Sequence, residues 1–381
     1  MIALARKTLV YEWRRFVPSV FAVGFAGVLL VMQAALVLGI FSTASIYVNA
    51  TSADLWVGYP GTQSVNYGRA IGPDVEMRLR MDGAISAVEP YIWLDGDWRA
   101  NSPDAEAMGG VSVYLSGIST AADAMMFDRV LAPWQRQLLR EPGAVIIDRA
   151  DLTSLASREG DVAWINNHKV RIAAAVDGLR GLGGVNVIAS LSTVREIASV
   201  PEGQGNTYLV ARTRPGVDAR QVQQRLNSEA RSFGPHETWT AKAFAHRSQM
   251  YWMFNTGAGA GVLFMAIVVC LVGAVVTSQS LRTVVAGSSR EYAVLNALGV
   301  SRSALGRVVV EQAFWIGAAG MVLAILASVA LLALARVYRV PVALNLQAML
   351  ACAVLIAVLA LFSGLGAIRG LLRADPAALL R

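Results

Sequence analysis

Residues 16–41 read FVPSVFAVGFAGVLLVMQAALVLGIF and contain no charged side chain. An α-helix needs roughly 20 predominantly apolar residues to cross a bilayer, so this stretch is long enough for one span. Three further apolar stretches follow, and the spans that we predict in them are residues 253–281, 308–335 and 347–368, of which only the second contains a charged residue, Glu311. The sequence therefore predicts an α-helical membrane protein with four transmembrane helices, one before and three after a long intervening segment.

The composition agrees with this interpretation. Of the 381 residues, 55% are hydrophobic and 15% are charged, whereas about 25% of the residues of a soluble domain are charged. This excludes an ordinary soluble enzyme, a disordered chain and a coiled coil. The two cysteines, Cys270 and Cys352, lie inside predicted spans, which excludes a disulfide scaffold. The first stretch exceeds the roughly 7–15 apolar residues of a signal peptide, so we expect it to be retained.

Basic residues concentrate in three short segments, residues 1–15, 282–307 and 369–381. Basic segments beside spans favour the cytoplasmic side of the membrane, where anionic lipid also attracts them. We therefore expect both termini and the loop 282–307 in the cytoplasm, and residues 42–252 and 336–346 on the outer side. Lipid accounts for the net charge of +7, so nucleic acid is not an expected partner.

Residues 42–252 are numerous enough for a globular domain of their own. Their periodicity predicts a mixed α/β fold with two strand–helix–strand units, the first at residues 54–57, 73–81 and 87–93, the second at residues 207–211, 217–233 and 237–241. Residues 111–119 alternate in the manner of a strand. Between the two units, further short strand-like runs predict a small β-rich insert; they are residues 144–147, 163–165 and 170–176.

Seven of the nine tryptophans lie between Trp56 and Trp252. Such residues either fill a core or line a surface for an amphiphilic substrate or partner, and we favour the core.

No motif for catalysis or metal binding is present. The sequence lacks the phosphate-binding loop G-x-x-x-x-G-K-[ST], the zinc motif H-E-x-x-H and the nucleophile motif G-x-S-x-G. The three histidines are far apart, so we expect no metal site and no cofactor bound by this chain. Asp95 and Asp97 in L-D-G-D-W could form a carboxylate pair, but we interpret this segment as a turn.

The loop between the second and third spans contains SSREYAVLNALGVSRS, residues 288–303. Ser288 and Glu291 have the spacing of a capping box, and Gly299 suits a left-handed helix end. A helix of only three turns is marginal in water, so it must rest on lipid or on another protein, and composition alone leaves both open. The face that would make this contact consists of Tyr292, Leu295, Leu298 and Gly299.

The spans carry two further signals. Arg307 and Glu311 lie four residues apart where the third span begins, which predicts an intramembrane charge pair. A structural or a mechanical role of this pair is favoured equally, and both are favoured over a proton relay. Two G-x-x-x-G motifs let helices approach closely and so predict helix packing sites; they are Gly257 with Gly261 and Gly366 with Gly370.

Residues 289–303, S-R-E-Y-A-V-L-N-A-L-G-V-S-R-S, resemble the R-E-I-x-x-L-x-A-[LI]-G-[AV]-S segment of FtsX-like ABC transporter permeases. Residues 373–381, R-A-D-P-A-A-L-L-R, resemble the D-P-x-x-[AL]-L-[RK] tail of the same family. The order of one span, a large domain and three spans also agrees. Tyr292 and Asn296 replace the small aliphatic and basic residues that are usual in the family.

Two other regions resemble DevC-type exporter permeases within that family. The first combines S-A-D-L-W-V at residues 52–57 with N-Y-G-R-A-I at residues 66–71. The second is Y-W-M-F-N-T-G-A-G at residues 251–259.

The resemblance implies the permease of a type VII, MacB-like ABC system in a bacterial inner membrane. Two permease copies would form a homodimer and pair with two ATPase subunits, which would bind ATP and Mg, so the permease itself would be non-catalytic. The ATPase would grip the cytoplasmic coupling helix that contains Arg290, Glu291, Tyr292, Leu295, Leu298 and Gly299. Its motion would pass to a periplasmic MacB-like core domain and drive export of an amphiphile, such as a glycolipid, with a periplasmic membrane-fusion adaptor and an outer-membrane channel.

Two alternatives stay open at this point. An FtsX-like signal transmitter would share the layout and control an extracytoplasmic partner without transport, although such proteins usually have a smaller outer domain. A membrane-anchored enzyme would instead show turnover by the isolated domain at residues 49–247, and we do not favour it.

Overall fold

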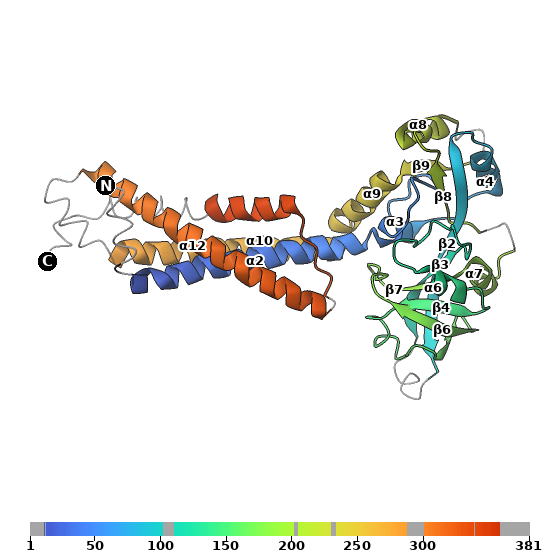
Figure 1. Cartoon of the computed structure of the whole chain (residues 1–381), viewed down its shortest axis with the longest axis horizontal. Helices are drawn as coiled ribbons and strands as arrows, with labels where there is room; N and C mark the ends of the chain where they lie inside the picture. Colours follow the sequence, from blue (N-terminus) through green and yellow to red (C-terminus); the bar gives the residue numbers. More distant parts are fainter. Residues whose placement is uncertain are drawn as a thin grey trace. The chain divides into compact units, whose positions relative to one another are not determined.

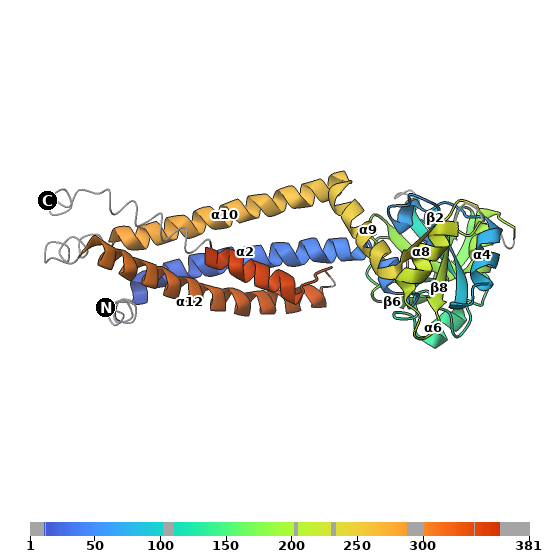
Figure 2. The same ribbon diagram turned by 90° about the horizontal axis from the view of Figure 1, so that it is seen from above.

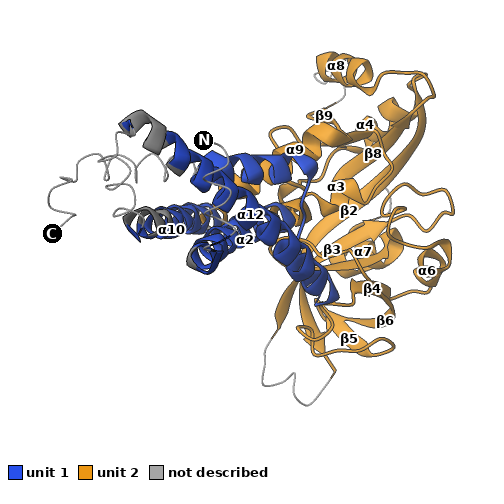
Figure 3. Cartoon of the chain, turned by 60° about the vertical axis from the view of Figure 1, so that its left-hand side comes forward, with its two compact units in different colours: residues 1–40, 260–381 blue, residues 41–259 orange. Residues whose placement is uncertain are grey.

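The computed structural model describes residues 11, 13–101, 110–201, 205–229, 234–287, 301–338 and 340–358. The chain divides into two compact units, coloured separately in Figure 3. One unit combines residues 1–40 with residues 260–381, and the other, called the α/β domain below, comprises residues 41–259.

Long apolar helices make up the first unit: α2 (Trp13–Thr43), α10 (Gly257–Gly287) and α12 (Arg302–Val337). Within them, three segments are long and apolar enough to cross a membrane, namely Phe16–Thr43, Gly259–Ser280 and Val310–Val337. These segments correspond to the first three predicted spans. The fourth predicted span coincides with a shorter apolar helix, Leu346–Val358, and its continuation lies outside the described residues.

The three long helices lie side by side in both views (Figures 1 and 2). Phe16 and Val23 of α2 are buried together with Ala313 and Ile316 of α12. Many other apolar side chains of these helices stay exposed, and Phe264 on α10 is 64% exposed. Such exposure would be costly in water, whereas lipid tails solvate it, so the helices have the surface of membrane spans.

In the α/β domain, the two predicted strand–helix–strand units form one antiparallel sheet with the order β2-β8-β1-β9. The first unit consists of β1 (Leu55–Gly58), α4 (Pro73–Arg80) and β2 (Ile85–Ala100). The second consists of β8 (Tyr208–Thr213), α8 (Ala219–Glu229) and β9 (Glu237–Thr240). Each βαβ crossover leaves a gap between its two strands, and a strand of the other unit fills it.

Alternation along β1 separates two cores. Leu55 and Val57 point to one face, where they are buried with Val75 and Leu79 of α4 and with apolar residues of α8. Trp56 points to the opposite face and belongs to a second core. This division follows from the two-residue period of a strand. Helix α4 is well delimited, because Pro73 occupies its first turn and arginines occupy its last turn, where they complement the helix dipole.

The insert between the two units is rich in strands, as predicted. It contains β3 (Val111–Ile118), β4 (Ala144–Asp148), β5 (Val162–Ile165), β6 (His168–Val176) and β7 (Val185–Ser190), with the helices α6 (Pro133–Leu138) and α7 (Leu191–Ala198). The order of its sheet is β3-β7-β4-β6-β5-β2, and β3 also pairs directly with β2. Strand β2 therefore takes part in both halves of the domain.

The interpretation of Asp95 and Asp97 as a turn is wrong. Both residues lie inside β2, where Asp95 is opposite Tyr114 and Asp97 is opposite Ser112 of β3. The glycine between them, Gly96, is accommodated because the strand passes close to Ile165; a Cβ atom built at Gly96 would come 2.9 Å from Ile165 Cγ2. A close approach, and not a turn, explains this glycine.

The chain enters and leaves the α/β domain through α3 (Ile46–Asn49) and α9 (Ala241–Phe254), which pack against each other. Ser45 Oγ accepts hydrogen bonds from Gln249 Nε2 and from Asn49 Nδ2, each at 2.8 Å. Neither helix runs on unbroken into its neighbouring span. A turn at Ala44–Ser45 separates α2 from α3, and a break at Asn255–Thr256 separates α9 from α10.

Candidate functional site

The predicted ATPase-docking residues lie outside the described part of the chain. They are Arg290, Glu291, Tyr292, Leu295, Leu298 and Gly299, and the same holds for Gly366 and Gly370. Helix α10 ends at Gly287 and α12 begins at Arg302, so the described helices flank this segment on both sides. Docking through these residues stays a prediction.

Arg307 and Glu311 lie one turn apart on α12. The arginine is exposed and the glutamate is half-buried. Among the described residues no ion pair joins these two side chains. A charge pair between them stays a prediction.

Gly257 and Gly261, the first G-x-x-x-G motif, have free space around them. A Cβ atom added at either glycine would meet no heavy atom of the described residues within 4 Å. Within this single chain, the two glycines therefore do not form the close helix contact that the motif predicts. A contact with a second copy of the chain stays a prediction.

Other glycines, for which we made no prediction from the sequence, bring α2 and α12 together. A Cβ atom at Gly27 would lie 2.7 Å from Ala324 Cβ, and one at Gly320 would lie 2.7 Å from Val23 Cγ1. Gly24 is equally close to Leu323. The spacing of Gly24 and Gly27 by three residues puts them on the same helix face, so it was a usable signal for this contact.

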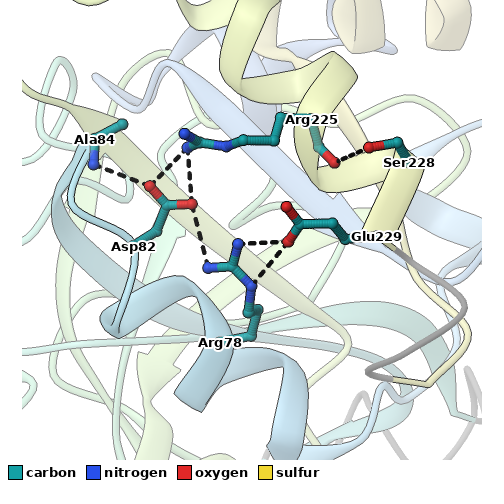
Figure 4. Close-up of polar contacts among 6 residues, drawn as sticks. All are labelled: Arg78, Asp82, Ala84, Arg225, Ser228 and Glu229. Carbon is teal, nitrogen blue, oxygen red and sulfur yellow. Dashed lines mark hydrogen bonds and ion pairs between the residues drawn. The ribbon is translucent and has the colours of Figure 1, made fainter.

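A network of charged side chains joins α4 to α8 in the α/β domain (Figure 4). Asp82 accepts hydrogen bonds from Arg78 at 3.2 Å, from Arg225 at 2.7 and 2.8 Å and from the backbone N–H of Ala84 at 2.9 Å. Arg78 also pairs with Glu229, which raises the pKa of the guanidinium. The network therefore joins the two helices over the sheet.

Glu89 is a buried acid on β2. Its Oε2 atom accepts hydrogen bonds from the backbone N–H groups of Met125 at 2.5 Å and Met126 at 3.3 Å, while Oε1 is buried and has no hydrogen-bond partner among the described residues. Burial raises the pKa of this carboxyl, and the two N–H donors together with the charge of Arg136 only partly offset that effect. Glu89 therefore attaches the segment containing Met125 to β2. Because the carboxyl is buried, its ionised form is electrostatically unfavourable.

The loop after β1 borders a cleft of about 230 Å³, lined in part by Tyr59, Tyr67, Arg69 and Tyr251. These residues come from regions far apart in the sequence, since Tyr251 belongs to α9. The rings of Tyr67 and Tyr251 meet edge to face, with their centroids 5.3 Å apart. The guanidinium of Arg69 lies over the ring of Tyr59, 5.4 Å from its centroid.

An ion pair holds the loop that forms one wall of this cleft. Glu237 Oε2 accepts from the N–H of Gly61 at 2.8 Å, and its Oε1 accepts from Arg247 at 3.0 Å. Trp239 Nε1 donates to the same Oε1 atom at 2.6 Å. Burial acts to raise the pKa of Glu237, but the three donors outweigh it, so the pKa lies below its usual value and the carboxyl is ionised at neutral pH.

The tryptophans of the domain mostly fill its cores, as we favoured. Trp56 and Trp98 are fully buried, and the ring of Trp56 meets those of Tyr91, Tyr208 and Phe244. Trp134 and Trp164 are exposed. Among the described residues, no group of three or more His, Cys, Asp or Glu side chains is placed to hold a metal ion.

Residues 263–376 match a family described as the FtsX-like permease C-terminal domain. This part of the chain is an FtsX-like permease domain. The resemblance to the FtsX-like permease family is thereby confirmed for this part of the chain, and the protein is a multi-pass membrane protein. The closer assignment to the DevC type stays a prediction. Among curated proteins no match to the permease was found.

Several solved structures are similar to part of the permease. The periplasmic region of MacB from Actinobacillus actinomycetemcomitans has 12% sequence identity and a TM-score of 0.36, and the match covers 52% of this chain and 94% of that one. The extracellular domain of the ABC-type transporter YknZ from Gram-positive bacteria has 10% identity and a TM-score of 0.33, with coverages of 49% and 98%. A domain of a putative permease protein from Porphyromonas gingivalis has 10% identity and a TM-score of 0.33, with coverages of 50% and 90%.

Proposed function

We propose that this chain is the permease subunit of an ABC exporter that moves an amphiphilic substrate, such as a glycolipid, out of the inner membrane. The match of residues 263–376 to the FtsX-like permease family carries this proposal. The matched region contains most of α10, all of α12 and the segment between them, in which the coupling helix is predicted. In this proposal a separate ATPase subunit supplies the energy.

In the proposed mechanism, ATP-driven closure of the ATPase pulls on residues 290–299 and shifts the attached α10 and α12. The shift reaches the α/β domain through the connections of α10 to α9 and of α2 to α3. Because both connections are broken at a turn, α3 and α9 can move as one piece, held together through Ser45 and Gln249. The proposal includes a homodimer, both termini in the cytoplasm, a periplasmic adaptor and an outer-membrane channel.

Copurification with the ATPase tests the central step. Leu295→Asp with Leu298→Asp puts two charges on the predicted docking face, so we expect the ATPase to be lost from the tagged permease. The matched control is Ala293→Asp with Ala297→Asp, which adds the same charges on the opposite face of the predicted helix and should retain the ATPase. Equal ATPase recovery with both double variants would refute docking through this face.

The signalling alternative predicts different partners. A transmitter of the FtsX type would copurify with an extracytoplasmic hydrolase, whereas an exporter would copurify with an adaptor. The large α/β domain, residues 41–259, favours export, because signal transmitters of this layout usually have a smaller outer domain.

A further inference from the structure

The cleft beside Tyr59 lies close in the sequence to the start of a span. Tyr251, which lines it, lies eight residues before Gly259, where the apolar segment Gly259–Ser280 begins. The structure also brings together two stretches that are separate in the sequence and that each carry the DevC-type resemblance. Tyr67 and Arg69 belong to residues 66–71, and Tyr251 belongs to residues 251–259. The proposed docking of an ATPase makes no use of this cleft.

Charge is the first property that restricts what the cleft can bind. Arg69 is exposed and is the single charged side chain among the lining residues. The negative charge of Glu237, which holds the neighbouring loop, is balanced by its ion pair with Arg247, and its second oxygen accepts a hydrogen bond from the N–H of Gly61. A guanidinium presents several donors in a planar fork, so it favours a phosphate or carboxylate over a neutral or cationic group.

Aromatic rings are the second property. Tyr59, Tyr67 and Tyr251 present large apolar faces, each with a hydroxyl at one end. Tyr67 is 49% exposed, and its ring also lies 6.2 Å from that of Trp252. Burial and the neighbouring Tyr251 raise the pKa of Tyr67, so its hydroxyl keeps its proton and can donate a hydrogen bond at neutral pH. Rings with one polar end are typical of sites at the interface between apolar and aqueous surroundings.

Size is the third property. Pockets that enclose a whole drug-sized ligand measure roughly 300–1,000 Å³, and this cleft measures about 230 Å³. It can therefore hold a head group but not the acyl chains of a lipid. The wall formed by Gly61 and Thr62 is fixed in advance, because Arg247 Nη1 contacts Thr62 O at 3.5 Å and Glu237 holds Gly61. A fixed wall lowers the ordering cost of binding.

We propose that this cleft binds the anionic head group of a membrane amphiphile, with Arg69 contacting the anionic group and Tyr59, Tyr67 and Tyr251 packing against the rest of the head group. The inference rests on the proposed export function and deepens it, because it names the substrate as an anionic amphiphile. The acyl chains would stay outside the cleft.

Binding can be measured on the full-length permease in phosphatidylcholine nanodiscs, without the ATPase. The probes for isothermal titration are dihexanoyl phosphatidylglycerol, which is anionic, dihexanoyl phosphatidylcholine, which is zwitterionic, and inorganic phosphate. We expect the anionic lipid to bind at least about tenfold more tightly than the other two probes. Partition of the lipids into the nanodisc is the same for every variant and can be subtracted.

Variants locate the site. Arg69→Ala should weaken binding of the anionic lipid by about tenfold, and Arg69→Lys should weaken it less, because the charge remains while the planar fork is lost. Tyr251→Phe keeps the ring and should bind nearly as well as the unmodified protein, whereas Tyr251→Ala should not. The matched control is Arg220→Ala, which removes an exposed charge at the start of α8. Unchanged thermal midpoints verify that the variants fold.

Three results would overturn the inference: equal binding of the two lipids, unchanged binding by Arg69→Ala, or inorganic phosphate binding as tightly as the anionic lipid. The last result would mean a site for a free anion. The lipid titration requires no ATPase, so its result is independent of the copurification experiment that tests the proposed function. If the ATPase still copurifies but no lipid binds at Arg69, only the inference about the cleft falls.

Discussion

Arg78 donates two hydrogen bonds to Glu229 Oε2, from Nε at 3.1 Å and from Nη2 at 2.5 Å, and so joins helix α4 to helix α8. The two residues are 151 positions apart in the sequence. In the sequence, the β-rich insert lies between these two residues. The contact therefore joins the first strand–helix–strand unit, which precedes the insert, to the second unit, which follows it. Asp82 continues the network from Arg78 to Arg225 (Figure 4).

Removing Asp82 should destabilise the α/β domain more than removing Glu229. The side chain of Asp82 is 2% exposed and serves two arginines and a backbone N–H, whereas that of Glu229 is 38% exposed. We expect Asp82→Ala to cost about 2–4 kcal/mol of unfolding free energy, and Glu229→Ala about 1 kcal/mol or less, because solvent screens an exposed pair. Thermal unfolding of the full chain measures both, with the exposed Asp123→Ala as control. Equal losses in Asp82→Ala and Glu229→Ala would contradict this ranking.

Glu89 should make stability depend on pH. Its pKa is higher in the folded protein than the ordinary value of 4.5, so the folded state holds the proton more tightly than the unfolded state does. The unfolding free energy should therefore fall as pH rises from about 4.5 through the raised pKa, and the effect is absent below 4.5, where both states are protonated. Glu89→Gln removes this titration.

The measurement is the difference in thermal midpoint between Glu89→Gln and the unmodified chain from pH 4 to pH 8. We expect the variant to gain relative stability as pH rises. Glu159→Gln, at an exposed position, is the control and should give a nearly constant difference. A constant difference for Glu89→Gln as well would show that this carboxyl titrates alike in both states.

Gly27→Leu should separate α2 from α12. A Cβ atom at this position already lies 2.7 Å from Ala324 Cβ and 3.2 Å from Ile356 Cδ1, so a larger side chain must push the helices apart. Overpacking of this kind costs about 1–3 kcal/mol, and the thermal midpoint in detergent should fall accordingly. Gly261→Leu is the matched control on α10, where the described part of the chain leaves open space. If Gly261 packs against a second copy, this variant should instead lower the dimer fraction in light scattering.

The elements of the domain could be predicted because each has a local signal. A short apolar run placed residues 207–211, and alternation placed residues 237–241, within one or two residues of the observed β8 and β9. Pro73 likewise set the start of α4. The length of β2 could not be predicted, since it continues to Ala100 through partners far away in the sequence, namely β8 along its first part and β3 and β5 along its second. For the same reason we interpreted the glycine between Asp95 and Asp97 as part of a turn, whereas pairing with β3 keeps it in an extended strand.

The candidate sites were predictable to different degrees. The coupling helix could be proposed because the residues of its contact face recur at helical spacing within one short segment of the sequence. The contact of Gly27 with Ala324 and the cleft of Tyr59, Arg69 and Tyr251 depend on segments brought together only by the fold. A single sequence without pairing information does not reveal which arginine meets which ring.

The orientation of the chain should follow its charge. We expect the loop after α10 to be cytoplasmic and the α/β domain to be outside, because lysines and arginines are retained on the cytoplasmic side. After replacement of Cys270 and Cys352 by alanine, single cysteines are introduced as Ser289→Cys in the loop and Thr153→Cys at an exposed position of the domain.

A membrane-impermeant maleimide should label Thr153→Cys on intact cells whose outer membrane is permeabilised, and should label Ser289→Cys only after the inner membrane is opened. Labelling of Ser289→Cys on intact inner membranes would place the coupling helix beyond the reach of any cytoplasmic ATPase. An ATPase can act only from the side of the membrane where ATP is present. That single result would therefore refute the proposed coupling to an ATPase and, with it, the proposal that this chain is part of an ABC exporter.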